Sequence, residues 1–207
     1  MASGTKRLPR AVREQQMLDA AVSAFSTKGF TDTSMDAIAA EAKISKPMLY
    51  LYYGSKDELF SACIARESGR FMEAMSSGFD PSMRQKDQAR TLVREFLRFV
   101  YQNSESWRVL YRVAVGTASF AHIVSDSRKN VTAMVTDLIR RGTTTEGASD
   151  VDFELTAVAL VGAGEAVADR ISEGDIDLET ATDLLLGITW RGLRGVGVPE
   201  DAVGDEH

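Results

Sequence analysis

Apolar residues recur at helical spacing along most of the chain. In residues 9–28 they form one stripe made of Val12, Met17, Leu18, Ala21, Val22 and Phe25. This spacing is typical of an amphipathic helix with one buried face. Gly29 follows the stripe, at a position where helices commonly end in a left-handed residue. No segment alternates apolar and polar residues as a half-buried strand does. The pattern therefore predicts an all-α protein.

Two short helices joined by a tight turn come next. The first, residues 35–42, has its apolar residues on one face: Met35, Ile38, Ala39 and Ala42. Residues 43–45 are long enough only for a turn, and Ser45 can cap a second helix that ends near residue 53. Two helices that cross at a three-residue turn form a helix-turn-helix, whose second helix fits the major groove of DNA.

Pairs of a hydroxyl residue and an acid, three positions apart, mark two helix starts beside this motif. Thr33 with Asp36 precedes the first short helix, and Ser55 with Glu58 opens a longer helix that reaches about residue 77. A break at residues 78–82 follows. Further helices are expected in residues 83–102, 104–115, 117–141, 151–172 and 177–194. The chain should therefore contain about nine helices.

Charge is distributed unevenly between the two parts of the chain. The 207 residues carry a net charge of −6. Residues 1–60 contain 8 Lys and Arg against 7 Asp and Glu, whereas residues 61–207 contain 16 against 23. The basic residues Lys6, Arg7, Arg10 and Arg13 stand near the start without any acid among them. This asymmetry predicts a polyanionic partner for the N-terminal part.

Composition argues against several other classes of protein. Cys63 is the only cysteine, so the chain has neither a disulfide framework nor a zinc-ligand set. No signal peptide opens the chain and no apolar run approaches the ~20 residues that span a bilayer, which predicts a cytoplasmic protein that does not use membranes. Motifs for serine hydrolases, zinc proteases, phosphate loops and dinucleotide binding are missing, and His122 with Asp126 is an isolated pair. We expect no enzyme activity, metal or cofactor.

Residues 14–60 resemble the DNA-binding domain of the TetR family of bacterial repressors. The matching positions are Gly29, Phe30, Thr33, Ser34, Ile38, Ala39, Ser45, Lys46, Leu49, Tyr50, Tyr53, Ser55, Lys56 and Leu59. The resemblance implies a DNA-binding domain in residues 1–60, with three helices around the helix-turn-helix, and a helical effector-binding and dimerisation domain in residues 61–207. Lys43 is a departure, because the family usually has Gly at this turn position, where a left-handed backbone is needed.

The resemblance, with the chemistry of each side chain, predicts the DNA contacts. The residues expected to read bases are Ser45, Lys46, Pro47 and Met48. Lys46 can donate to guanine O6 and N7, and Met48 can contact a thymine methyl group. The residues expected to contact phosphate are Thr33, Ser34, Tyr50, Tyr52 and Lys56, although Tyr52 is also consistent with a plain surface aromatic. Lys6, Arg7 and Arg10 form either an arm that enters the minor groove or a tail without a role.

The second domain is expected to bind an effector and a second copy of the chain. The predicted pocket residues are Phe96, Phe99, Val100, Trp107, Leu110, Tyr111, Phe120, Ile123 and Met134. They suit a small apolar or amphipathic effector, and the interleaved Arg94, Arg98, Arg108 and Arg112 suit an acidic head group. The alternative is an ordinary core with solvated arginines. Residues 96–113 also resemble family members that respond to fatty acids or acyl-CoA.

Dimerisation is predicted through the two C-terminal helices. The expected interface residues are Val158, Val161, Gly164, Val167, Leu185 and Ile188, and the alternative is a core within one chain. A dimer would read a palindromic operator. We therefore expect a ligand-responsive homodimer, a repressor that the effector releases from DNA. The alternatives are an activator, an architectural factor or an all-α enzyme.

Overall fold

The computed structural model describes residues 9–78, 80, 82–142 and 150–194, and every element in this part of the chain is a helix. Their bounds are α1 (Arg10–Asp32), α2 (Met35–Glu41), α3 (Lys46–Tyr52), α4 (Lys56–Ser77), α5 (Gln85–Gln102), α6 (Ser104–Arg108), the π-helical turn η1 (Val109–Val113), α7 (Ala114–Gly116), α8 (Ala121–Gly142), α9 (Asp150–Glu173) and α10 (Leu178–Arg194). Because α6, η1 and α7 follow one another without a break, the described residues form nine helical segments. The all-α prediction is confirmed.

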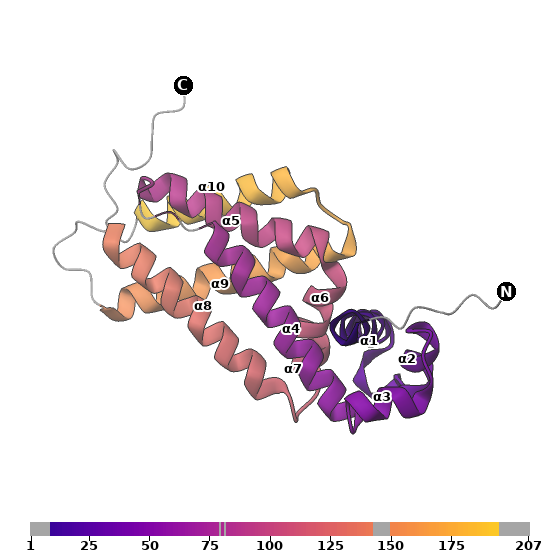
Figure 1. Ribbon diagram of the computed structural model, residues 1–207. Helices are drawn as coiled ribbons and strands as arrows, with labels where there is room; N and C mark the ends of the chain where they lie inside the picture. The colour runs from indigo at the N-terminus through magenta and orange to yellow at the C-terminus, as the bar shows by residue number, and fades with distance from the viewer. Residues whose placement is uncertain (1–8, 79, 81, 143–149, 195–207) are drawn as a thin grey trace.

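The helices form two lobes that α4 connects (Figure 1). The smaller lobe contains α1, α2 and α3 and lies at one end of the molecule. From there α4 crosses the larger lobe, in which α8 packs along α9 and α5 packs along α10. Its 22 residues give α4 a length of about 33 Å. A single helix thus extends from the end of the helix-turn-helix deep into the larger lobe.

The first of the two predicted caps is displaced by one residue. Ser34, not Thr33, is the N-cap of α2, and its hydroxyl accepts a hydrogen bond from the Ala37 amide at 3.2 Å. Thr33 is only 2% exposed, and its hydroxyl donates to the carbonyl oxygen of Gly29 at 2.7 Å. Gly29 has a φ of 77°, which turns the chain at the end of the predicted first helix. The prediction of a Thr33 cap was wrong because this hydroxyl faces inward.

The cap at the start of α4 is confirmed. The Ser55 hydroxyl accepts from the Glu58 amide at 3.1 Å, and the Glu58 carboxylate accepts from the Gly54 amide at 3.2 Å. Both bonds satisfy amide groups that a helix start would otherwise leave without partners. The position of α4 is therefore fixed locally at the point where it leaves the smaller lobe.

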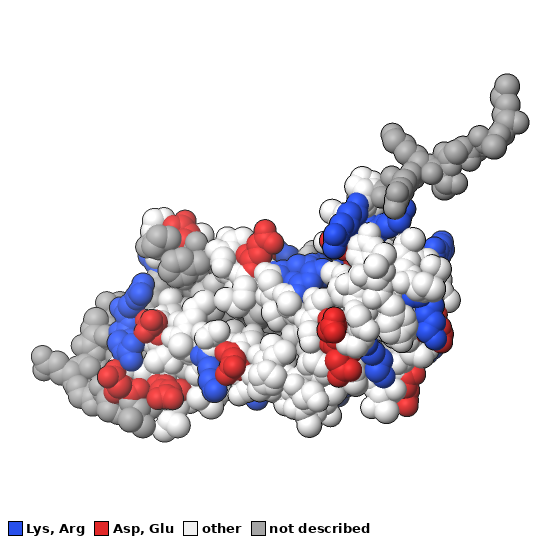
Figure 2. All heavy atoms as spheres, turned by 60° about the horizontal axis from the view of Figure 1, so that its bottom comes forward, with Lys and Arg blue, Asp and Glu red and all other residues white. Residues whose placement is uncertain are grey.

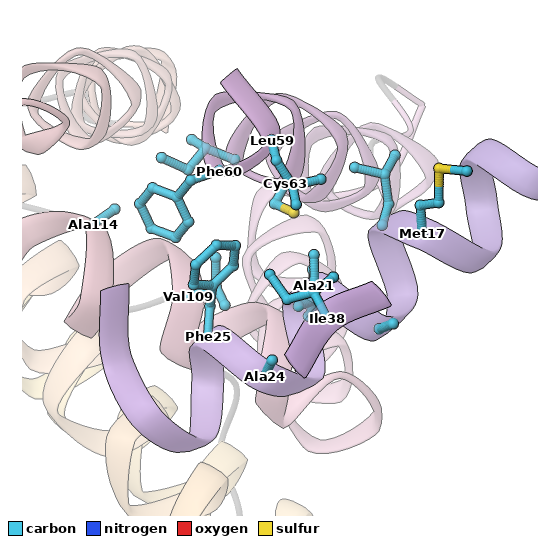
Figure 3. Close-up of a cluster of buried hydrophobic side chains, with 14 of the residues drawn as sticks. Met17, Ala21, Ala24, Phe25, Ile38, Leu59, Phe60, Cys63, Val109 and Ala114 are labelled. Atoms are coloured by element: carbon cyan, nitrogen blue, oxygen red, sulfur yellow. The ribbon is translucent and has the colours of Figure 1, made fainter. Parts of the chain in front are cut away.

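One buried apolar cluster joins the two lobes (Figure 3). It contains Phe25 of α1 and Ile38 of α2, and it continues through Phe60 of α4 to Val109 and Ala114 of η1 and α7. The expected boundary between residues 60 and 61 falls inside α4 and inside this cluster. The boundary stays a prediction about function, since packing does not separate the two parts.

Cys63 lies in the same cluster with no exposed surface. Burial raises the pKa of its thiol to about 12, because a thiolate would lose its hydration there. The thiol therefore stays protonated at neutral pH and packs as a small apolar side chain.

None of the described helices is both long and apolar enough to cross a membrane.

Candidate nucleic-acid interface and ligand cavity

The outer face of α3 is exposed, and Lys46 at its start is the residue of this face that bonds to a neighbouring helix, α2. Lys46 and Pro47 are exposed at its start, and Tyr50 and Leu51 are 42% and 82% exposed one turn later. Leu49, on the opposite face, is completely buried. Lys43 precedes this helix with a φ of 54°, so the left-handed turn expected at this position is present although the residue is not Gly. The exposed face belongs to the second helix of the helix-turn-helix, the helix that enters the major groove in proteins with this motif.

Leu51 was not among the residues selected from the sequence. Its side chain is apolar and exposed, so it can contact a thymine methyl group. This is the role that the sequence predicted for Met48. Met48 is instead half-buried against the core, and its sulfur accepts a hydrogen bond from Arg13 at 3.7 Å. The exposure of Leu51 could have been predicted from its helical position, because it follows Pro47 by one turn and lies on the face opposite the buried Leu49.

Lys46 is held in a polar contact at the start of α3. Its ammonium donates to the Asp36 carboxylate at 2.9 Å, and this hydrogen bond raises the pKa of Lys46. Both side chains are at least half exposed, so water screens the pair and Lys46 can leave Asp36 for another acceptor at little cost. The pairing keeps the ammonium beside the exposed face of α3 before any DNA is bound.

Lys56 has an internal role that the sequence did not suggest. Its ammonium donates to the carbonyl oxygens of Phe30, Thr31 and Thr33 at 2.8, 3.2 and 3.1 Å, and it lies 4.4 Å from the centre of the Phe30 ring. These three acceptors match the three N–H groups of an ammonium. The expected phosphate contact conflicts with this arrangement, in which Lys56 joins the end of α1 to the start of α4.

Three further DNA-contact predictions change with the structure. Thr33 is buried, so its hydroxyl cannot reach a phosphate in this conformation. Arg10 is the first residue of α1 rather than part of an arm, and it pairs with Glu14 at 2.9 Å and lies 5.3 Å from the centre of the Tyr52 ring. Tyr52 itself packs against the core. Lys6 and Arg7 lie outside the described residues.

Charge on the smaller lobe is mixed rather than uniformly basic. Figure 2 shows Lys and Arg side chains at several points of the lobe built from α1, α2 and α3, with acidic side chains between them. This matches the nearly balanced count of residues 1–60. Attraction to DNA must therefore come from a few placed cations and not from the net charge of the lobe.

The larger lobe contains a partly open apolar cavity of about 140 Å³. Its walls come from α4, α5, α8, α9 and α10, and they include Phe71, Met75, Leu92, Phe96, Met134, Leu138, Leu160, Gly164 and Leu185. Glu165 is the only charged residue in the lining. An engineered cavity of similar volume and apolar lining stays dry and binds small apolar molecules. The space is thus suited to an apolar group and not to ordered water.

Most of the residues expected to line a pocket lie elsewhere. Only Phe96 and Met134 line the cavity. Leu110, Phe120 and Ile123 pack in the cluster that joins the lobes, where the Phe120 ring lies 4.9 Å from that of Phe60. The others pack beside the cavity in two further groups: Val100, Trp107 and Tyr111, and Phe99 against Phe71.

The four interleaved arginines also lie outside the cavity lining. Arg94 pairs with Glu179 at 3.2 Å and Arg98 pairs with Glu95. Arg108 donates to the carbonyl oxygen of Ser172 at 2.6 Å, and Arg112 pairs with Glu173 at 2.7 Å. Their expected role with an acidic head group stays a prediction; in this structure they hold α5, α6 and η1 to neighbouring acids and to α9 and α10.

Comparison with known proteins agrees with both lobes. Residues 17–63 match the family model of bacterial regulatory proteins of the tetR family, and residues 86–192 match the tetracyclin repressor-like C-terminal domain. The chain belongs to the TetR family. It is a helix-turn-helix transcriptional regulator that binds DNA.

Individual transcriptional regulators resemble the chain over most of its length. The crystal structure of a TetR-like transcriptional regulator from Rhodococcus sp. RHA1 is 54% identical, with a TM-score of 0.82 over 91% of this chain and 100% of that one. The HTH-type transcriptional activator FasR of Mycolicibacterium smegmatis is 29% identical, over 92% of this chain and 87% of FasR. The HTH-type transcriptional repressor SCO4008 of Streptomyces coelicolor is 30% identical, over 81% of this chain and 92% of SCO4008. The relatives thus include both an activator and a repressor of transcription.

The expected TetR-family dimer surface is only partly exposed. On α9 and α10, Val158 and Ile188 are 51% and 50% exposed. Gly164 and Leu185 are instead buried beside the cavity, and Val161 and Val167 are half-buried. Two residues that the sequence did not single out, Leu155 and Leu184, are exposed on the same helices at 62% and 48%. The apolar surface available to a partner therefore differs from the predicted one by a rotation of each helix.

Proposed function

We propose that the protein is a homodimeric repressor that binds a palindromic operator and is released from it by an apolar effector. The observation that carries the proposal is the position of α4. Its residues Phe71 and Met75 line the cavity, and Lys56 at its other end is bonded to the end of α1. About 22 Å of continuous helix separates Phe71 from Lys56.

In the proposed complex, α3 of each protomer enters a major groove. Ser45, Lys46, Pro47 and Leu51 meet the base edges, and Tyr50 and Ser34 contact phosphate. Exposed apolar residues on α9 and α10 hold the two protomers together, so that the two α3 helices read half-sites ~34 Å apart. Leu155, Val158, Leu184 and Ile188 support this interface because large apolar side chains gathered on two helices are uncommon on a monomer surface.

Release follows from the link between the cavity and the smaller lobe. An effector that enlarges the cavity displaces Phe71 and Met75, and with them α4. Because Lys56 and the shared core join α4 to α1, the smaller lobe moves with it and the spacing of the two α3 helices changes. The effector thereby selects a conformer that fits the operator poorly.

Repression needs only that the bound dimer occupy a promoter, whereas activation needs an additional contact with the transcription machinery. Deleting the gene is expected to raise transcription from promoters that carry the operator. A fall in that transcription would instead support the activator reading, which FasR exemplifies among the relatives. The effector class we propose is a fatty acyl chain, because almost the entire cavity lining is apolar.

Gly164→Leu tests the proposed release. A Cβ at Gly164 would lie 3.4 Å from the Phe96 ring, so a leucine side chain there fills part of the cavity. We expect an operator affinity close to that of the wild type and at least a tenfold loss of fatty-acid-induced release. Fluorescence anisotropy of labelled operator DNA, titrated with fatty acid, measures both. Gly69→Leu, on an exposed part of α4, is the control and should keep the release.

A matched pair of lysine variants tests the DNA-binding surface. Lys46→Ala is expected to reduce the preference for the operator over a single-base variant by about 1–3 kcal/mol, without changing the stability of the fold. Lys56→Met is expected to lower stability by about 1–3 kcal/mol and to leave the salt dependence of binding unchanged. Operator titrations at several salt concentrations and urea denaturation measure these effects. If Lys56→Met instead lowered the slope of log affinity against log salt by about one, the result would support the original prediction that Lys56 contacts a phosphate.

A further inference from the structure

The apolar cavity has a polar neighbour. A groove of about 600 Å³ lies between α8 and α9, and Val161 and Glu165 line both the groove and the cavity. These two side chains therefore form the wall between an apolar chamber and a polar surface channel. A molecule with a long apolar chain and a polar end would have a place for each part on the two sides of this wall.

An arginine stands on the groove side of the wall. Arg128 of α8 donates from Nε and Nη2 to the two carboxylate oxygens of Glu165, at 2.8 and 2.5 Å. The Glu165 side chain is 18% exposed and that of Arg128 is 52% exposed. This pair occupies one edge of the guanidinium and fixes its plane. Among the described residues, Nη1 on the other edge has no hydrogen-bond partner, so this edge is available to a second acceptor.

We propose that Arg128 binds the anionic end of the effector whose acyl chain enters and enlarges the cavity. This inference rests on the proposed function and adds the charge of the ligand and the residue that recognises it. The chain passes the wall at Val161 and Glu165, and the anion accepts hydrogen bonds from the outer edge of Arg128. Ser125 and Thr132 line the groove about one turn before and after Arg128 and offer hydroxyl donors to the same anion.

The existing pairing favours an anion over a cation. A cationic ligand that paired with Glu165 would have to displace Arg128 and leave its guanidinium without a carboxylate. An anion uses N–H groups that have no partner and leaves the pair intact. The other cations of the groove already have close acids: Lys129 pairs with Asp126 at 3.0 Å, and Arg140 pairs with Asp137 and Asp150 at 2.6 and 3.1 Å.

The experiment measures dissociation constants of the full-length protein for four probes with the same chain: palmitate, methyl palmitate, hexadecylamine and palmitoyl-CoA. We expect palmitate to bind about tenfold or more tightly than its methyl ester, as is usual for one charge-assisted contact. Arg128→Gln should remove this difference and leave the affinity for the ester unchanged. Lys129→Gln, one residue along and in the same groove, is the matched control and should keep the difference. Thermal melting confirms that both variants fold.

The two anionic probes distinguish the source of the charge. If Arg128→Gln weakens palmitate, the anion is the carboxylate of a free fatty acid. If it weakens palmitoyl-CoA more strongly than palmitate, the anion is a phosphate carried by a thioester. Either result supports the proposal, because the affinity in each case depends on Arg128 and not on Lys129.

Other outcomes overturn the proposal. Equal affinity for palmitate and its ester, or tighter binding of the amine, would show that Arg128 recognises no anion, while the proposed apolar effector would still stand. Equal weakening of acid and ester by Arg128→Gln would show that Arg128 only supports the cavity. If none of the four probes bound to the wild type, both this inference and the proposed effector class would fail.

Discussion

Val158→Asp is expected to separate the homodimer and to weaken operator binding by a factor on the order of a hundred to ten thousand. Val158 is 51% exposed on α9, among the apolar residues proposed to face the partner. Burying a carboxylate there without a partner is costly, so the substitution opposes association. A single protomer then holds one half-site and loses the gain that comes from linking two binding events.

Analytical ultracentrifugation and operator titrations measure the two effects together. Tyr101→Asp is the matched control, because Tyr101 is 61% exposed on α5, outside the proposed interface, and receives the same charge. It should leave both the dimer and the operator affinity unchanged. A Val158→Asp protein that remains dimeric would place the interface on another surface.

Glu67→Ala is expected to lower the free energy of unfolding by about 3–5 kcal/mol. The Glu67 side chain is completely buried and accepts from Arg66 at 2.6 Å and from Arg70 at 2.9 Å. Arg66 also pairs with Asp19 of α1 at 2.6 Å, and Arg70 donates to Asn103 between α5 and α6 at 2.5 Å. Removing the carboxylate leaves the mostly buried Arg66 with reduced compensation.

Urea denaturation of the full-length protein measures this loss. Glu73→Ala is the control, because it removes an exposed acid from the same helix, and it should change stability by less than about 0.5 kcal/mol. A similarly small change for Glu67→Ala would mean that the two arginines find other acceptors. Since the network joins α1, α4 and the junction of α5 and α6, we also expect Glu67→Ala to weaken the effect of ligand on DNA binding.

The elements of the fold follow from local patterns, which is why they could be predicted. Helical periodicity is visible within each segment, and the Ser55–Glu58 cap requires only four neighbouring residues. Thr33 shows the limit of such local reasoning. Thr33 and Ser34 are both good cap residues, and the choice between them depends on which hydroxyl the end of α1 buries. That contact belongs to tertiary packing and leaves no local signal.

The residues of the candidate sites depend even more on contacts between distant segments. Lys56 and Phe30 are 26 positions apart, and nothing near either residue shows that the ammonium is used internally. An aromatic-rich segment can indicate that side chains are buried, but not on which side of the helix they pack. The π-helical turn η1 changes the rotation of the chain after α6, so that Val109 and Leu110 face the smaller lobe while Tyr111 stacks on Trp107.

The shared core has a practical consequence for biosensor engineering. Joining the DNA-binding domain of one regulator to the effector-binding domain of another is a common way to make a chosen gene respond to a new ligand. In this protein, Phe25 and Phe60 of the DNA-binding lobe pack in one core with Val109, Ala114 and Phe120. A hybrid joined after residue 60 would take these three residues from the other regulator. A functional hybrid must therefore carry these three core residues together with the DNA-binding lobe.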